Sequence, residues 1–150
     1  MRHLIISREY PPAPYPPGGI GTYVVNIARL LAEAGDTVHV LGQRWSAAPL
    51  HREMLVDGRL IVHRVAEDDL PDGADGRELE RLRRERDGLR AGDFPVRWFS
   101  WAAAHFAERL VEQEGVDVIE AQEWEAPLHH LLMRRAAGLG PRKAPPCLVH

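Results

Sequence analysis

Three glycines stand close together near the N-terminus, at Gly18, Gly19 and Gly21. They follow a short apolar run and precede a segment of helical periodicity, so we expect them in a turn between a strand and a helix. Without Cβ atoms, such a turn lets backbone N–H groups approach a phosphate or a sugar hydroxyl, which the helix dipole favours. The same glycines could also serve only a tight corner, and the pattern by itself leaves both interpretations open.

A second group of polar side chains follows a buried strand expected over residues 116–120. Glu120 ends this strand, and Gln122, Glu123, Trp124 and Glu125 follow it, where open parallel sheets place their ligands. Carboxylates and an amide bind hydroxyl groups, and an indole packs against a sugar ring or a lipid. Alternatively, Glu123 and Glu125 favour the N-terminus of the next helix while Trp124 packs locally.

The glycine turn differs from the signatures of dinucleotide and nucleoside triphosphate sites. The fingerprint G-x-G-x-x-G, begun at Gly19 and Gly21, requires a third glycine where Val24 stands. The next strand should also lead to an acid that binds a ribose, but the chain continues with Gly42 and Gln43. No G-K-[ST] follows the glycines either. These differences argue against a dinucleotide-dependent oxidoreductase and against an NTPase.

The eight histidines and the single cysteine, Cys147, form no metal motif and allow no intrachain disulfide. We therefore expect no metal and no cofactor, and a cytoplasmic location is the simpler interpretation. The net charge of -3 disfavours nucleic acid as a partner. No run approaches the roughly 20 apolar residues of a membrane span, which leaves peripheral contact with a membrane open.

Strand, helix and strand alternate along the first forty residues, which is the pattern of a parallel sheet. We expect a strand over 3–7, a helix over 20–35 and a strand over 37–41. Asp57, which is followed by a glycine, begins a tight turn and predicts a hairpin over 54–65 near a sheet edge. At 150 residues, 45% of them hydrophobic, the chain fits one α/β domain.

The second half of the chain continues this alternation. A charged helix over 77–90 is interpreted as a solvated surface helix or, alternatively, as a mobile flap over a cleft. An apolar helix over 96–114 is expected to pack in the core. We further expect a helix that begins at Pro127 and a last strand over 146–150. The residues expected on the buried face of that helix are Leu128, Leu131, Leu132 and Ala136.

The stretch from Ser7 to Leu41 resembles the start of the family-four GT-B glycosyltransferases, in which a strand leads through a proline-bearing loop into a Gly-Gly-x-Gly turn and a helix. The matching positions are Pro11-Pro12, Gly18-Gly19-Ile20-Gly21-Thr22 and Ala32-Glu33-Ala34-Gly35-Asp36-Thr37-Val38-His39-Val40. The family's strand and loop facing the acceptor are similar to Asp117-Val118-Ile119-Glu120-Ala121-Gln122-Glu123-Trp124. The related starch and glycogen synthases carry a lysine before the glycine pair, where this chain has Pro16, so that branch is disfavoured.

The resemblance implies a Rossmann-like, mostly parallel sheet with helices on both faces, the N-terminal half of a GT-B fold. It implies a retaining enzyme that moves a sugar from a nucleotide-diphosphate sugar to an acceptor. The family also has a histidine just past the last strand, which makes His150 the candidate catalytic residue. Donor binding is implied for Gly18, Gly19 and Gly21, and acceptor binding for Glu9, Gln122, Glu123 and Trp124.

In that family the nucleotide pocket belongs to a second domain, which residues 1–150 lack. We therefore expect this acceptor-side domain to be inactive alone, either as a piece of a longer protein or as a subunit that needs a partner. The alternative is a non-catalytic α/β module that binds a protein or a small ligand through the Trp124 region or the charged helix.

Overall fold

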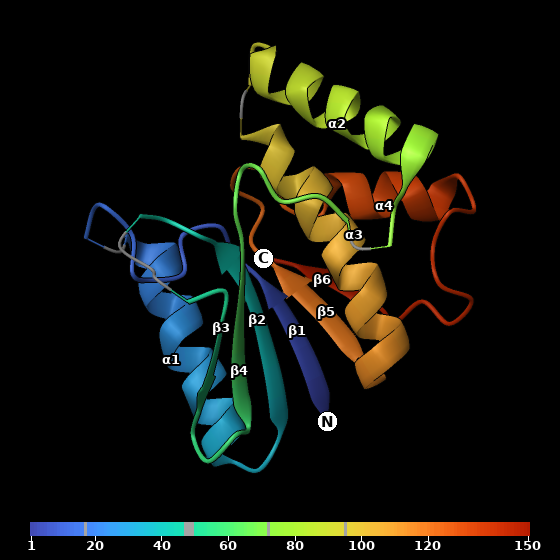
Figure 1. The fold of residues 1–150 in the computed structure, drawn as a ribbon. Helices are drawn as coiled ribbons and strands as arrows, with labels where there is room; N and C mark the ends of the chain where they lie inside the picture. Colours follow the sequence, from blue (N-terminus) through green and yellow to red (C-terminus); the bar gives the residue numbers. More distant parts are fainter. Residues whose placement is uncertain (17, 47–49, 72, 95) are drawn as a thin grey trace.

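The computed structural model describes residues 1–16, 18–46, 50–71, 73–94 and 96–150. Within these ranges the chain forms one sheet and a set of helices around it (Figure 1). The strands are β1 (Arg2–Ile6), β2 (Thr37–Gln43), β3 (Arg52–Leu55), β4 (Leu60–Val65), β5 (Val118–Ala121) and β6 (Cys147–Val149). The helices are α1 (Gly19–Glu33), α2 (Gly76–Ala91), α3 (Arg97–Glu114) and α4 (His129–Ala136).

The sheet has the strand order β3-β4-β2-β1-β5-β6. All neighbours pair in parallel except β3 and β4, which form an antiparallel hairpin with β3 at the edge. The turn of this hairpin has positive φ angles of 50°, 51° and 83° at Val56, Asp57 and Gly58. The hairpin predicted from the Asp-Gly step, and its place at a sheet edge, are therefore confirmed.

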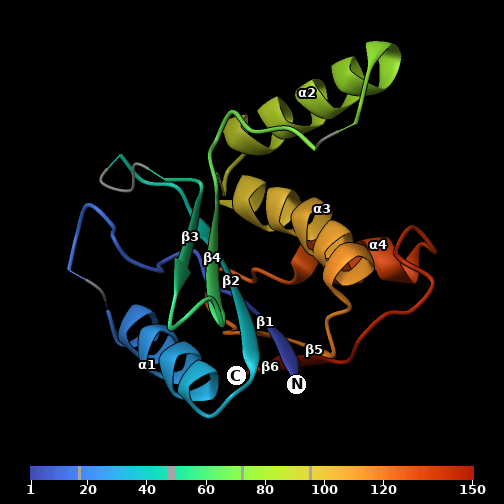
Figure 2. The same cartoon turned by 60° about the horizontal axis from the view of Figure 1, so that its bottom comes forward.

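Helices cover both faces of the sheet. α1 lies against one face, α3 and α4 lie against the other, and α2 lies outside α3 (Figure 2). Side chains alternate along β1, so that Ile5 joins the core under α1 while Leu4 and Ile6 join the core under α3 and α4. This arrangement confirms the expected Rossmann-like α/β architecture.

The two helices that precede β5 differ in burial. α3 buries Trp98 and Trp101, with 4% and 1% of their surface exposed, and ends at Gly115, whose φ of 66° suits glycine. In α2 the buried residue is Leu82, and ion pairs such as Arg81 with Glu78 lie along its exposed surface. α2 is thus the solvated helix that its charge pattern predicts, docked on α3.

The helix after β5 departs from the expectation in two ways. α4 begins at His129 rather than at Pro127, because Glu125 and Ala126 adopt positive φ angles and prolong the loop. Leu128 and Leu131 are buried, but Leu132 and Ala136 are exposed. The predicted four-residue buried face was therefore wrong in its second half, since this short helix meets α3 through one narrow stripe. Within the described ranges no helix is long and apolar enough to span a membrane.

Candidate functional site

The glycine corner lies at the edge of the sheet where the parallel strands end. Gly18 is the N-cap of α1 in an extended conformation, and no side chain caps the N–H groups of this helix. A Cβ atom added at Gly19 would meet nothing within 4 Å, and one at Gly18 would lie 3.5 Å from Oε2 of Glu9. Gly18 and Gly19 are exposed, whereas Gly21 is buried. The corner is therefore open, with uncapped N–H groups and a carboxylate beside it.

A small pocket lies beside this corner, between the loops that follow β1 and β5. It encloses about 20 Å³, which is room for roughly one water molecule or one ligand hydroxyl. Oγ of Ser7 and both amide atoms of Gln122 have no hydrogen-bond partner in the described structure, although these residues are only 3% and 8% exposed. Glu9 and Trp124 also line this pocket, and Trp124 is 65% exposed.

Backbone hydrogen bonds bring Glu123 and His150 together at the same edge. The N–H of Glu123 donates to the carbonyl of His150 at 2.8 Å, and the N–H of His150 donates to the carbonyl of Ala121 at 3.1 Å. Glu123, one of the predicted acceptor residues after β5, and the candidate histidine after β6 are thus neighbours. Both side chains are exposed at this edge.

A buried carboxylate connects the histidine to α1. Oε1 of Glu120 lies 3.2 Å from Nε2 of His150 and accepts the hydroxyl hydrogen of Tyr23 at 3.3 Å. Partial burial, followed by the negative charge of Glu120, raises the pKa of Tyr23, so the phenol stays protonated and donates. Three segments distant in sequence therefore meet at one carboxylate.

Arg8 and Glu125 join the two loops that flank the small pocket. Nε and Nη2 of Arg8 donate to the two carboxylate oxygens of Glu125. Burial by itself would lower the pKa of Arg8, but the hydrogen bond and the charge of Glu125 hold it above its ordinary value. Glu125 was a candidate for stabilising the next helix electrostatically, but it pairs with this arginine instead.

The sequence analysis did not single out Ser7, Arg8 or Tyr23. Ser7 and Arg8 directly follow β1, and the end of a parallel strand is itself a signal for a ligand site. Tyr23 stands four residues after Gly19, one helical turn along the same face of α1. Position alone could therefore have suggested all three residues.

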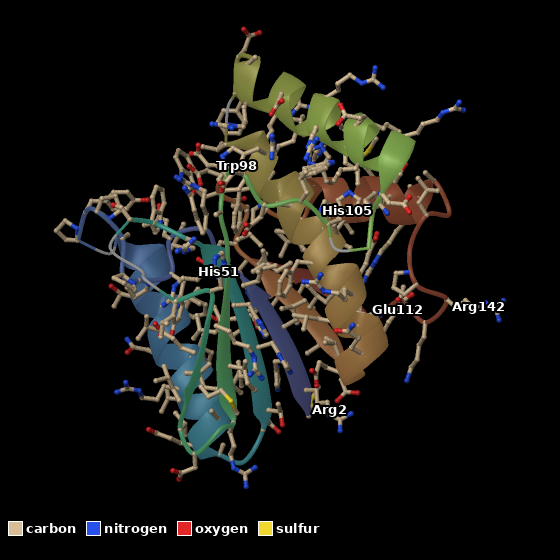
Figure 3. The ribbon with its side chains drawn as sticks, viewed as in Figure 1. Arg2, His51, Trp98, His105, Glu112 and Arg142 are labelled. Atoms are coloured by element: carbon tan, nitrogen blue, oxygen red, sulfur yellow. The ribbon has the colours of Figure 1, made fainter. Side chains whose placement is uncertain are left out.

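A larger groove of about 710 Å³ lies elsewhere, between α3 and the β3-β4 hairpin. Figure 3 labels His51 before β3 and His105 and Glu112 on α3, which belong to its lining. The lining shares no residue with the small pocket. Its arginines and acidic residues balance, so its charge favours no ligand class. The arginines are Arg52, Arg64 and Arg109, and the acids are Asp69, Glu108 and Glu112.

Comparison of the chain with models of known protein families identifies its family. A family model described as a glycosyl transferase 4-like domain matches residues 18–150. No curated protein and no solved structure matches the chain. The match begins at the glycine corner and includes the loop after β5 and the residues around His150. Because it spans most of the sequence, this protein belongs to the glycosyl transferase 4-like family.

Proposed function

We propose that this chain is the acceptor-side domain of a retaining glycosyltransferase that transfers a sugar from a nucleotide-diphosphate sugar to an acceptor. The observation that carries the proposal is the open corner at Gly19 beside a pocket with unpartnered polar atoms of Ser7 and Gln122. An unsatisfied buried polar group costs about 1–3 kcal/mol, and a hydroxyl of a bound sugar relieves that cost. Membership of the family makes a sugar the appropriate polyhydroxylated ligand.

The donor side of the proposed site is the start of α1. The N–H groups of this helix have no side-chain cap, and its first turn contains no acidic residue. Such a terminus attracts a phosphate or a transferred sugar through its dipole and its free donors. Gly18 and Gly19, which are exposed, admit the donor, and Gly21 is buried in the first turn of α1 behind them.

The acceptor side is formed by the loops after β1 and β5. Glu9, Gln122 and Glu123 supply oxygen and nitrogen atoms for hydroxyl groups, and exposed Trp124 offers its indole face to a sugar ring. His150, beside Glu120, is the proposed catalytic residue.

The nucleotide itself requires further contacts, which we assign to a second domain facing this edge of the sheet. Residues 1–150 are then inactive alone, and transfer takes place in the cleft between the two domains. The proposal involves no metal and no cofactor besides the donor. A cytoplasmic location, inferred from the single cysteine, stays a prediction.

The test compares residues 1–150 with a longer form that contains the donor-binding domain. Both are screened for release of nucleoside diphosphate from a panel of nucleotide sugars, with and without sugar acceptors. We expect turnover from the longer form and none from residues 1–150. In the longer form Gly19→Trp should abolish turnover, because an indole at the open corner occupies the donor position.

Gly19→Ala is the matched control. Its added methyl group meets nothing within 4 Å, so this variant should stay folded and retain turnover. Equal activity of the tryptophan and alanine variants would contradict a ligand at the corner. A longer form that binds no nucleotide sugar would favour the non-catalytic α/β module.

A further inference from the structure

We propose that Arg8 is a positioning residue, which pairs with Glu125 to hold the loop over residues 122–128, here called the acceptor loop, in the conformation that presents Trp124. The consequence for acceptor binding rests on the proposed function. The effect on the loop itself does not, because it follows from contacts within this chain.

The contact between the two side chains is well formed and largely buried. Arg8 engages both carboxylate oxygens of Glu125, with Nη2 to Oε1 at 2.5 Å. Each side chain is 15% exposed, so solvent screens the pair far less than a surface ion pair. A planar guanidinium matches a carboxylate in this forked geometry, which fixes orientation as well as charge.

Arg8 is itself held from the opposite side. Nη1 donates to Oε1 of Gln43 at 3.3 Å, and the guanidinium lies 5.2 Å from the ring centre of Trp45. Tyr15 packs edge-on against that indole, with ring centres 5.6 Å apart. The arginine is therefore a rigid anchor to which the acceptor loop attaches.

The acceptor loop needs such an anchor, because its backbone is strained. Glu125 and Ala126 have φ angles of 62° and 46°, in the left-handed region that residues with a Cβ atom avoid. Outside a hairpin turn such as that at Val56 and Asp57, two successive residues keep this conformation only where the surroundings enforce it. The N–H of Ala126 donates to the carbonyl of Glu123 at 2.9 Å, which closes the turn, and the ion pair holds the first strained residue.

Trp124 lies between two fixed points of this loop. On one side the N–H of Glu123 is bonded to the carbonyl of His150, and on the other side Glu125 is bonded to Arg8. With 65% of its surface exposed, Trp124 is only weakly constrained by packing. Its direction is therefore set by the backbone between these points, and the ion pair ties that backbone to the loop that bears the glycine corner.

The first experiment measures amide hydrogen exchange of residues 122–128 in the chain of residues 1–150. Glu125→Gln and Arg8→Gln each remove the ion pair, and each should speed exchange in the acceptor loop by about tenfold or more, with circular dichroism unchanged. Arg90→Gln is the matched control. Arg90 lies on α2, and Nη2 of its side chain forms an exposed ion pair with Oε2 of Glu67 at 3.0 Å, which this variant removes. It should leave exchange in the acceptor loop as it is. The double variant should behave like either single variant, since both remove one interaction.

The second experiment uses the longer, donor-binding form of the protein. Glu125→Gln and Arg8→Gln should each raise the KM for the acceptor about tenfold and leave the KM for the donor unchanged. Arg8→Lys should raise the acceptor KM less than Arg8→Gln does, because lysine keeps a positive charge beside Glu125. Unchanged exchange in the acceptor loop of both glutamine variants overturns the proposal, as does faster exchange with an unaltered acceptor KM. If the wild-type longer form shows no turnover, the proposed function is contradicted. If Glu125→Gln still speeds hydrogen exchange in the acceptor loop, the anchoring of the loop remains supported.

Discussion

Nε2 of His150 lies 3.2 Å from Oε1 of Glu120, and the two residues come from segments 30 positions apart that the parallel pairing of β5 and β6 brings side by side. Glu120 is the penultimate residue of the buried strand β5 and has 9% of its surface exposed. The oxygen that faces His150 also accepts a hydrogen bond from Tyr23. The carboxylate thus orients a histidine at the proposed cleft and links it to the helix that starts at the glycine corner.

This contact predicts graded losses of activity in the longer form. His150→Ala should lower kcat about 100-fold or more, the usual contribution of a residue that moves or holds a proton at the reacting atoms. Glu120→Gln keeps the shape but removes the charge, and should lower kcat about tenfold, since a hydrogen bond to a charged group contributes roughly 1.5–3 kcal/mol. Steady-state kinetics at saturating donor measure both effects.

Tyr23→Phe serves as the control for that series. It removes the other hydrogen bond to Glu120 and leaves the contact with His150 in place, so it should have the smallest effect on kcat. A fully active His150→Ala variant would contradict the catalytic role of this histidine.

The unpartnered atoms of the small pocket predict a separation of stability from binding. Oγ of Ser7 has no partner in the described structure, so Ser7→Ala removes a buried unsatisfied group and should leave the free energy of unfolding unchanged or raise it, by up to about 1–3 kcal/mol. The same variant should raise the acceptor KM about tenfold if a ligand hydroxyl occupies the pocket, as should Gln122→Leu. Urea denaturation and acceptor titration are the two measurements. A Ser7→Ala variant destabilised by more than about 1 kcal/mol would show that the hydroxyl has a structural partner instead.

A pair of buried histidines predicts how stability depends on pH. Nδ1 of His39 lies 3.1 Å from Nε2 of His63, and the two rings stack. Burial, followed by the charges of His39, Arg52 and Arg109, lowers the pKa of His63 to about 3. A histidine in the unfolded chain titrates near pH 6.5. Between these values the unfolded state binds more protons, so stability that is present above about pH 6.5 is lost as the pH falls toward 3.

His63→Gln removes this proton uptake while its amide can still bond to His39. Below pH 6 the free energy of unfolding should fall less steeply with decreasing pH in the variant than in the wild type. The two slopes should differ by about 1.4 kcal/mol for each pH unit. Urea denaturation at pH 7, 6, 5 and 4 gives both slopes. Parallel curves for wild type and variant would show that His63 does not titrate on unfolding.

The docking of α2 predicts a local rather than a global effect. Leu82 is 2% exposed and is the buried residue of this helix, so Leu82→Ala should remove about 2–3 kcal/mol of its packing on α3. Hydrogen exchange should become faster over residues 76–91, while exchange in the strands of the sheet and the melting temperature of the protein stay nearly constant. The half-buried Leu79 provides the comparison, since Leu79→Ala should have a weaker effect. Exchange that rises equally throughout the chain would contradict separate docking of α2.

The sequence by itself determined the elements and most of the fold. Apolar runs such as Leu4 to Ile6 and the helical spacing after Gly19 identified strands and helices, because burial imposes a period that depends only on local residue order. The turn after Asp57 identified the edge hairpin, and the three glycines identified the start of α1. The sequence did not predict the start of α4, because the left-handed turn at Glu125 and Ala126 is not a local preference of these residues.

Only the tertiary structure decided which side chains meet. Arg8 and Glu125 are 117 positions apart, and the folded chain places the unpartnered, buried amide of Gln122 in the same pocket as Ser7 and Glu9. Such contacts depend on the register of the strands and on the conformations of two loops. Neither produces a periodic pattern in the sequence of the segments that meet. The elements were therefore predictable from local patterns, whereas the pairs that build the site required the folded chain.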